Sequence, residues 1–149
     1  MVEMQQDTNS RELRLLSLLY WFLSILTDAN GHTAINRKGS SNSRKYVSKA
    51  VEYIEKNYSR KVCISEISNF IGIDRSYLYS TFKQHLNISP QEFLINYRMN
   101  KACELMSNKA LFIGDIARSV GYEDQLLFSK EFKKLKGFSP REYRKLYIK

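Results

Sequence analysis

Hydrogen-bonding and basic side chains are concentrated between residues 124 and 136, where the apolar residues have helical spacing. Phe128 and Phe132 lie four residues apart and would point to the same side of a helix. The other side would carry amide, hydroxyl and ammonium groups, at Gln125, Ser129, Lys130, Lys133 and Lys136. Such groups can contact base edges and phosphates. On this stretch alone, a nucleic-acid-binding surface and an ordinary solvated basic face explain the pattern equally well.

A shorter amphipathic stretch comes before it and ends at a glycine. A helix there would place four apolar side chains on one face, namely Ile113, Ile116, Ala117 and Val120. Gly121 follows directly, where a glycine can adopt the left-handed conformation that ends many helices. The small side chain of Ala117 would let two helices cross closely. Two helices joined by a tight turn form a helix-turn-helix unit, which we expect over residues 113–136.

The same unit occurs twice in the chain. Gly72 has its counterpart 49 positions later at Gly121, whereas Phe82 has its counterpart 50 positions later at Phe132. One residue is therefore inserted in the second copy, between Gly121 and Phe132. The first helix-turn-helix unit is expected over residues 63–86. A repeat of a whole supersecondary unit is far more specific than a single helical hairpin.

Each unit is followed by the pattern Ser-Pro-x-Glu. In residues 89–92 and 139–142, the serine can cap a helix, the proline suits its first turn, and the glutamate can complete a capping box. These patterns predict a connecting helix over residues 89–107 and a C-terminal helix over residues 140–147. The sequence has no alternating apolar run long enough to suggest a sheet, so the expected fold class is all-α.

Two helix-turn-helix units in tandem, joined by a helix, resemble the AraC/XylS family of bacterial transcription regulators. The resemblance covers residues 43–148 and is carried by I-A-R-S-V-G-Y-E-D-Q-L-L-F-S-K-E-F-K-K, Y-R-M-N-K-A-C-E-L-M and G-F-S-P-R-E-Y-R-K. It implies a homeodomain-like DNA-binding domain at residues 44–149, which binds double-stranded DNA sequence-specifically with two recognition helices in successive major grooves. A separate domain would sense a small molecule. Cys63 departs from the family pattern, because a serine or threonine is common at that helix start.

Two sets of side chains are expected to face the DNA. Leu78 and Phe82 in the first unit should point into the core, which turns the other residues of that helix outward. Phe128 and Phe132 play the same part in the second unit. The expected groove-facing residues are Arg75, Ser76, Tyr77, Tyr79, Ser80 and Lys83 in the first unit, and Asp124, Gln125, Leu126, Ser129, Lys130 and Lys133 in the second. The resemblance implies base contacts at Ser76, Ser80, Gln125, Leu126 and Lys130.

Side-chain chemistry indicates that the second unit discriminates between DNA bases more strongly than the first. Gln125 can pair bidentately with adenine, Lys130 can reach guanine acceptors, and Leu126 can contact a thymine methyl. Ser76 and Ser80 are short, so we expect them to reach phosphates or to act through water.

The charge of the chain is unevenly distributed. The net charge is +9, and residues 1–36 hold four acidic residues against two arginines, which leaves +11 on residues 37–149. This favours a polyanionic partner for the larger part of the chain. Arg98, on the expected connecting helix, resembles a family position that contacts or orients near the DNA backbone; a plain surface arginine fits the sequence nearly as well.

The first part of the chain has a different character. Within residues 1–27, the stretch 11–27 reads as a helix whose apolar residues cover more than one side. We expect it to form a homodimer or the tail of a sensor domain; folding back on its own domain is the alternative. Residues 28–43 are rich in Gly, Ser and Asn and are expected to form a linker. Because no room is left for a sensor domain, we expect the chain to be part of a longer regulator.

Motifs for catalysis or cofactor binding are missing from the sequence. It has no H-E-x-x-H, no G-x-S-x-G, no phosphate-binding Gly-rich loop, and no metal-ligand spacing around Cys63 or Cys103. We therefore expect no enzyme activity and no cofactor. The two cysteines suit a reducing cytoplasm, and the apolar run 15–26 is shorter than the roughly 20 residues that span a bilayer.

The expected partners follow from these features. They are double-stranded DNA, a second copy of the chain through residues 11–27, and RNA polymerase, with no membrane. The alternative function is a protein-interaction module that uses its apolar N-terminal helix and binds nucleic acid without sequence preference.

Overall fold

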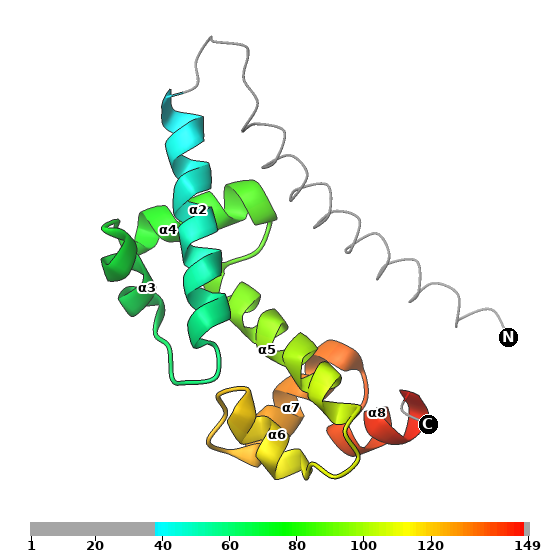
Figure 1. Cartoon of the computed structure of the whole chain (residues 1–149). Coiled ribbons are helices and arrows are strands. Elements are labelled where there is room, and N and C mark those ends of the chain that lie inside the picture. Colours follow the sequence, from blue (N-terminus) through cyan, green and yellow to red (C-terminus); the bar gives the residue numbers. More distant parts are fainter. Residues whose placement is uncertain (1–37, 148–149) are drawn as a thin grey trace, which may run out of the picture. The chain divides into compact units, whose positions relative to one another are not determined.

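Seven helices make up the regular structure in the computed structural model, which describes residues 38–147 (Figure 1). In chain order they are α2 (Lys38–Asn57), α3 (Ile64–Ile71), α4 (Arg75–Leu86), α5 (Pro90–Met106), α6 (Ile113–Ser119), α7 (Gln125–Lys136) and α8 (Pro140–Tyr147). These residues fall within one compact unit of the chain. No strand occurs in the described range, so the expected all-α class is confirmed, as are the connecting and C-terminal helices. The expected helix and dimer contact at residues 11–27 lie outside the described residues.

Helix α5 joins two groups of three helices (Figure 1). The first half of the domain consists of α2, α3 and α4, and α2 packs against both of the others. The second half consists of α6, α7 and α8, in which α7 packs against both α6 and α8. Helix α5 contacts α4 in the first half and α6 and α7 in the second. Each half thus contains one helix-turn-helix unit, α3–α4 or α6–α7, in agreement with the sequence repeat.

The core of the first half is formed where the apolar faces of its helices meet. Val47, Ala50 and Ile54 recur at three- and four-residue steps along α2, and all three are fully buried. Leu78 and Phe82 of α4 are also fully buried, as the sequence predicted. The opposite side of α4 is therefore turned to solvent.

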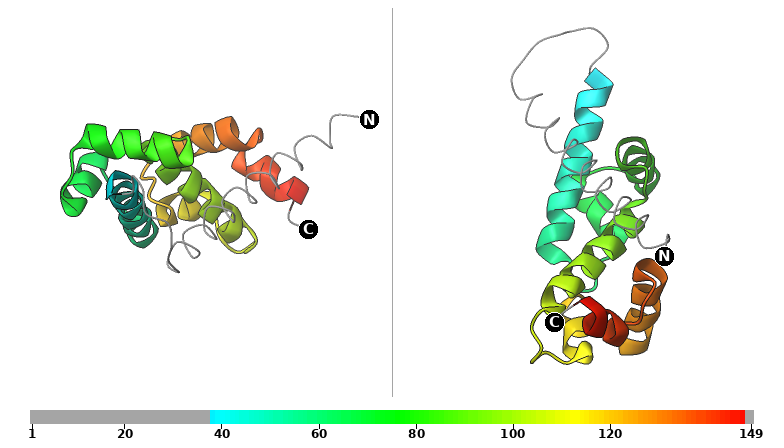
Figure 2. Two further views of the ribbon diagram at one scale, coloured as in Figure 1. Left: turned by 90° about the horizontal axis from the view of Figure 1, so that it is seen from above. Right: turned by 90° about the vertical axis from the view of Figure 1, so that its right-hand side faces the viewer.

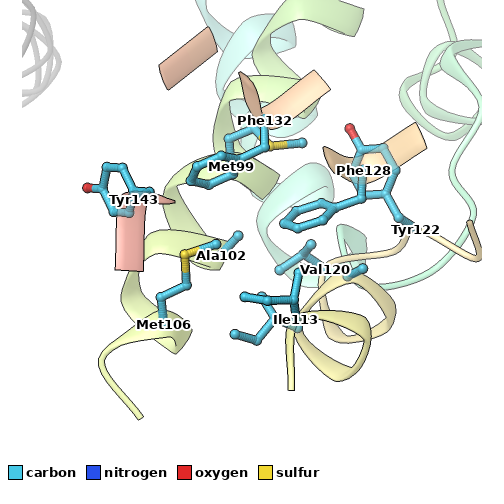
Figure 3. Close-up of a cluster of buried hydrophobic side chains, with 11 residues drawn as sticks. Met99, Ala102, Met106, Ile113, Val120, Tyr122, Phe128, Phe132 and Tyr143 are labelled. Carbon is cyan, nitrogen blue, oxygen red and sulfur yellow. The ribbon is translucent and has the colours of Figure 1, made fainter. Parts of the chain in front are cut away.

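The second half has a larger core, to which α5 contributes one side (Figure 3). Phe128 and Phe132 of α7 are fully buried, which confirms the predicted inward face of that helix. Met99 and Met106 of α5 and Ile113 of α6 point toward them in Figure 3. Burying a side chain of this size typically stabilises a fold by about 1.5–3 kcal/mol. This cluster holds α7 against α5 and α6.

The linker predicted for residues 28–43 is shorter than expected at its C-terminal end. Helix α2 begins at Lys38, so residues 38–43 of that stretch are helical. The Gly, Ser and Asn content of residues 38–43 suggested a linker, because these residues have low helix propensity. Ser43 is only 4% exposed, and its Oγ lies 2.9 Å from Nε2 of His85 at the end of α4. His85 is therefore held against α2.

The predicted capping boxes are both present. The Ser89 N–H donates to Glu92 at 2.6 Å, and the Glu92 N–H donates to Ser89 Oγ at 3.2 Å. The Ser139 and Glu142 pair repeats this arrangement at 2.8 and 3.3 Å. Cys63 occupies the N-cap position of α3 but makes no side-chain cap bond. Its departure from the family pattern thus leaves the start of α3 without this stabilisation.

Glu66 should give the first half an acid-sensitive contribution to stability. Hydrogen bonds from Arg60 and Tyr53 lower the pKa of Glu66 from 4.5 to about 2. A carboxyl group with a depressed pKa stabilises the fold above its unfolded value, so this contribution should disappear as the pH falls from about 4.5 to 2. We expect the Glu66 carboxyl to titrate near pH 2 by NMR, and the Glu66→Gln variant to lose less stability over that window than the parent chain. A midpoint near 4.5, the ordinary pKa of a glutamate, would contradict the hydrogen bonds from Arg60 and Tyr53.

Candidate nucleic-acid interface

Helices α4 and α7 lie on the same side of the described part of the chain. Both views in Figure 2 show this arrangement, with the two helices separated along the direction of α5. Each is the second helix of its helix-turn-helix unit, which is the helix that enters the major groove in DNA-binding proteins of this kind. The fold therefore presents two such helices to one partner at the same time.

The first predicted set lies on the exposed side of α4. Arg75, Ser76 and Ser80 are exposed, as are the rings of Tyr77 and Tyr79, and Lys83 is partly exposed. Tyr77 is at the edge of the set, because its ring meets Tyr46 of α2 edge-on at 6.0 Å. Lys83 lies 3.4 Å from Glu92, but both side chains keep about half of their surface in solvent (40% and 55%). A pair so exposed is worth little, so Lys83 remains free to exchange Glu92 for a phosphate.

A hollow of about 390 Å³ opens beside the N-terminal end of this set. Its walls come from the starts of α3, α4 and α5, at Ile64, Arg75, Ser76, Tyr79, Ser89, Pro90 and Gln91. Three of the predicted groove-facing residues, Arg75, Ser76 and Tyr79, therefore share one concave surface. The hollow could not be predicted from the sequence, because it depends on how three helix ends converge.

One member of the second predicted set also has a structural role. Asp124 is the N-cap of α7, and its carboxylate accepts a hydrogen bond from the Leu126 N–H at 2.7 Å. Asp74 occupies the same N-cap position in α4. The residue inserted in the second copy therefore lies in the turn before α7, and equivalent positions on α4 and α7 differ by 50. Asp124 is exposed as expected and also caps α7, and its place in the DNA-facing set stays a prediction.

The same offset identifies residues that the sequence pattern missed. Tyr77 corresponds to Leu127, which was not in the predicted set but is 51% exposed. Lys134 is also exposed on α7. Gln125, Leu126 and Lys130 are all exposed as predicted, and Leu126 has 73% of its surface in solvent. Ser129 is partly buried and Lys133 is exposed.

Gln125 lies against the first turn of α6. A Cβ atom built on Gly114 would be 2.8 Å from Oε1 of Gln125, so the amide lies directly over this glycine. The contact places the amide close to where α7 begins, at the end of the helix from which base contacts are commonly made. The position of Gln125 is therefore set in part by a neighbouring helix, which the sequence did not indicate.

The Gly114→Ala substitution should separate the stability of α6 from the position of Gln125. Alanine is favoured over glycine inside a helix by about 0.5–1 kcal/mol, and the crowded atom is the end of a flexible side chain that can move away. We expect a rise in the free energy of unfolding of about that size, measured by urea denaturation. Displacement of the amide should appear as a changed NMR shift of the Gln125 side-chain NH2 group. A loss of stability would show that the amide cannot move.

Arg98 is buried, so the alternative of a plain surface arginine is wrong, whereas a role near the DNA backbone stays a prediction. Only 8% of its surface is exposed, and its guanidinium donates to the carbonyl oxygens of Tyr58 and Arg60 at 2.9 and 2.7 Å. Its pKa is lowered by burial, with Tyr122 acting in the opposite direction. The signal available in the sequence, a basic residue on a helix, cannot distinguish a buried arginine from an exposed one.

Across residues 38–147, no helix is both long and apolar enough to cross a membrane. In the same range, no group of three or more His, Cys, Asp or Glu side chains is placed to hold a metal ion. Both cysteines there are free thiols.

Comparison with known proteins gives the same assignment as the geometry. Residues 67–146, more than half of the chain, match the model of a family described as a helix-turn-helix domain. The raffinose operon transcriptional regulatory protein RafR of Pediococcus pentosaceus is 42% identical over 96 residues, which are 64% of this chain and 35% of that protein. The Msm operon regulatory protein of Streptococcus mutans is 33% identical over 138 residues, 93% of this chain and 49% of that protein.

A solved structure extends the comparison to three dimensions. The C-terminal domain of AraT, a response regulator from Geobacillus stearothermophilus, matches with a TM-score of 0.68 and 37% identity, covering 70% of this chain and 87% of that one. The chain spans half or less of the length of the curated relatives described above. By its tandem helix-turn-helix units, its family match and its relatives, the chain belongs to the AraC-type helix-turn-helix transcription regulators.

Proposed function

We propose that residues 38–147 bind a specific sequence in double-stranded DNA by placing α4 and α7 in successive major grooves. The observation that carries the proposal is the matched exposure of the two helices on one side of the domain (Figure 2). Successive major grooves on one face of B-DNA recur about every 34 Å. A domain that presents two recognition helices can therefore read two half-sites at once, provided that their separation suits the groove spacing or the DNA bends.

The two helices would make different kinds of contact with the DNA. Gln125, Leu126 and Lys130 on α7 offer an amide, an apolar group and a cation, which suit adenine, a thymine methyl and guanine acceptors respectively. On α4 the central exposed side chains are the short Ser76 and Ser80. We expect α4 to contribute phosphate and water-mediated contacts, and α7 to contribute most of the base discrimination.

Selection from a pool of random duplexes tests this function. The parent chain should enrich sequences with two short motifs about one helical turn apart, and the motif bound by α7 should be the better defined. The affinity for an enriched duplex should exceed the affinity for a shuffled duplex by at least about 10³-fold. The absence of any enriched motif, with equal affinity for both duplexes, would favour the alternative of a protein-interaction module with non-specific affinity for nucleic acid.

The wider role of the protein is also part of the proposal. RafR and the lactose operon transcription activator of Staphylococcus xylosus are named for sugar operons, which supports a role in activating genes of carbohydrate use. A separate domain would sense a small molecule, and RNA polymerase would be a second partner. Because bacterial DNA lies in the cytoplasm, the protein would act there, through binding rather than catalysis. Self-association through residues 11–27 stays a prediction.

A further inference from the structure

One buried cation links the two halves of the domain. Arg98 lies midway along α5, and its guanidinium reaches back to the first half, where it donates to the carbonyl oxygens of Tyr58 and Arg60. Both carbonyls follow the C-terminal end of α2, where unpaired carbonyl oxygens favour a cation. The first half is therefore bonded to the middle of the connecting helix, well away from the α4–α5 junction.

The second half contacts the same guanidinium. The Arg98 guanidinium carbon lies 5.4 Å from the centre of the Tyr122 ring, a cation–π distance. Tyr122 belongs to the turn between α6 and α7 and is only 8% exposed. A Cβ built on Gly121, the preceding residue, would be 2.8 Å from Arg98 Nη2 and 2.5 Å from the Tyr58 carbonyl oxygen. The turn of the second unit and the end of α2 thus approach each other directly around Arg98.

Apolar contacts reinforce this junction. Tyr58 packs against the buried core of the second half although it follows α2 of the first half. Its ring also meets Tyr97 of α5 edge-on, with the centroids 5.2 Å apart. We use the name Arg98 junction for Tyr58, Arg60, Arg98, Gly121 and Tyr122.

Without these contacts, α5 alone would join the halves. The ends of a helix can fray, so the joints between α5 and the two halves could change their angles. The Arg98 junction adds a second connection, so two points rather than one determine the angle between the halves. Simultaneous use of two recognition helices depends on that angle, because one additional base pair rotates a half-site by about a tenth of a turn.

We propose that Arg98 is the positioning residue that fixes the relative orientation of α4 and α7. It thereby makes the affinity for DNA depend strongly on the spacing between the two half-sites. The proposal deepens the two-groove function above and rests on it for its DNA consequence. Arg98 touches no base in this scheme; it acts through the turn that precedes α7 and through the end of α2. Removing its guanidinium should leave both helix-turn-helix units folded but free to change their relative angle.

A distance measurement in the free protein tests the orientation without DNA. In a Cys103→Ala background, the exposed Cys63 at the start of α3 is the remaining thiol, and Lys134→Cys adds one on α7. Spin labels at these two positions should give a narrow distance distribution by pulsed EPR in the presence of Arg98. In the Arg98→Met variant, which keeps the length of the side chain without the donors, the distribution should broaden.

Arg144→Met provides a matched control. Arg144 donates from Nη1 to the Leu111 carbonyl oxygen at 2.8 Å, so it too holds a backbone carbonyl, but within the second half. Its loss should lower stability without broadening the distribution. If circular dichroism shows that Arg98→Met does not fold, Arg98→Lys replaces it. Its distance distribution should broaden too, because one ammonium group cannot reproduce the planar guanidinium that reaches both carbonyls and faces Tyr122.

Duplexes with altered spacing test the consequence for DNA binding. The two selected motifs are placed at the preferred separation and at one base pair more or less. The parent chain should lose roughly 10²-fold in affinity when the spacing changes, because the second helix can no longer engage. Arg98→Met should bind the preferred duplex more weakly and vary by only a few-fold across the series, while Arg144→Met keeps the parental dependence.

The distance measurement and the duplex-spacing series distinguish a failure of this proposal from a failure of the proposed function. A narrow, unchanged distance distribution in Arg98→Met, together with a parental spacing dependence, would overturn the proposal and leave Arg98 as an ordinary packing residue. If the parent chain selects no DNA motif but the distribution broadens as expected, the proposed function is wrong while the positioning role of Arg98 stands.

Discussion

Gly121→Ala should be among the most damaging single substitutions in the described part of the chain. Gly121 has a φ of +86°, in the left-handed region that costs a residue with a Cβ roughly 1–2 kcal/mol. The added Cβ would also be 2.5 Å from the Tyr58 carbonyl oxygen, a backbone atom that can move only if α2 and the second half separate. Together these effects should lower the free energy of unfolding by about 3 kcal/mol or more.

Gly72→Ala is the matched control for this prediction. Gly72 ends the equivalent helix of the first unit with a φ of +80°, but no atom lies within 4 Å of the position its Cβ would take. We expect Gly72→Ala to lower the free energy of unfolding only by the backbone cost of about 1–2 kcal/mol. Urea denaturation followed by circular dichroism compares the two. Equal losses would show that the close approach of the two halves at Gly121 does not contribute to stability.

The helical architecture could be predicted because it is encoded locally. The helix ends at Gly72 and Gly121 and the capping boxes at Ser89 and Ser139 each involve residues only a few positions apart. The repeat then identified two copies of one unit. The last residues of the expected linker are helical instead, and one of them, Ser43, contacts His85, 42 residues away. A pattern of neighbouring residues contains no information about such a contact.

The candidate interface was predictable to a similar extent. The inward positions of Phe128 and Phe132 follow from helical periodicity, and they place Gln125 and Lys130 outside. The capping role of Asp124 depends on where the inserted residue lies in the turn, and the sequence located it only between Gly121 and Phe132. The burial of Arg98 depends on the approach of the two halves, which no single segment specifies.

Gln125→Ala and Lys133→Ala should have different effects on DNA binding. Gln125 lies at the start of α7 and offers a donor and an acceptor to one base. Its loss should cost about 1–3 kcal/mol on the selected duplex and relax the preference at one base position, with little change on shuffled DNA. Lys133 offers only charge, so its loss should weaken binding to both duplexes by about the same factor.

Salt dependence separates the two roles most clearly. Residues 37–149 carry a net charge of +11, and Lys130, Lys133 and Lys134 are exposed on α7. A protein that contacts six to ten phosphates loses about 10³–10⁵-fold in affinity between low and moderate salt, because each contact releases counterions. We expect a dependence of this kind for the parent chain, measured by fluorescence anisotropy over a salt series. A flat dependence would be incompatible with DNA binding through these lysines.

The slope of that salt dependence then shows whether each residue contacts a phosphate or a base. The logarithm of the binding constant should fall less steeply by roughly one unit of slope in Lys133→Ala, because one phosphate contact is missing. Gln125→Ala should keep the parental slope, since an uncharged amide releases no counterion. Suppose instead that Gln125→Ala weakens selected and shuffled duplexes by one common factor. The amide would then be bound to the DNA backbone, and the base reading assigned to α7 would have to come from Leu126 and Lys130.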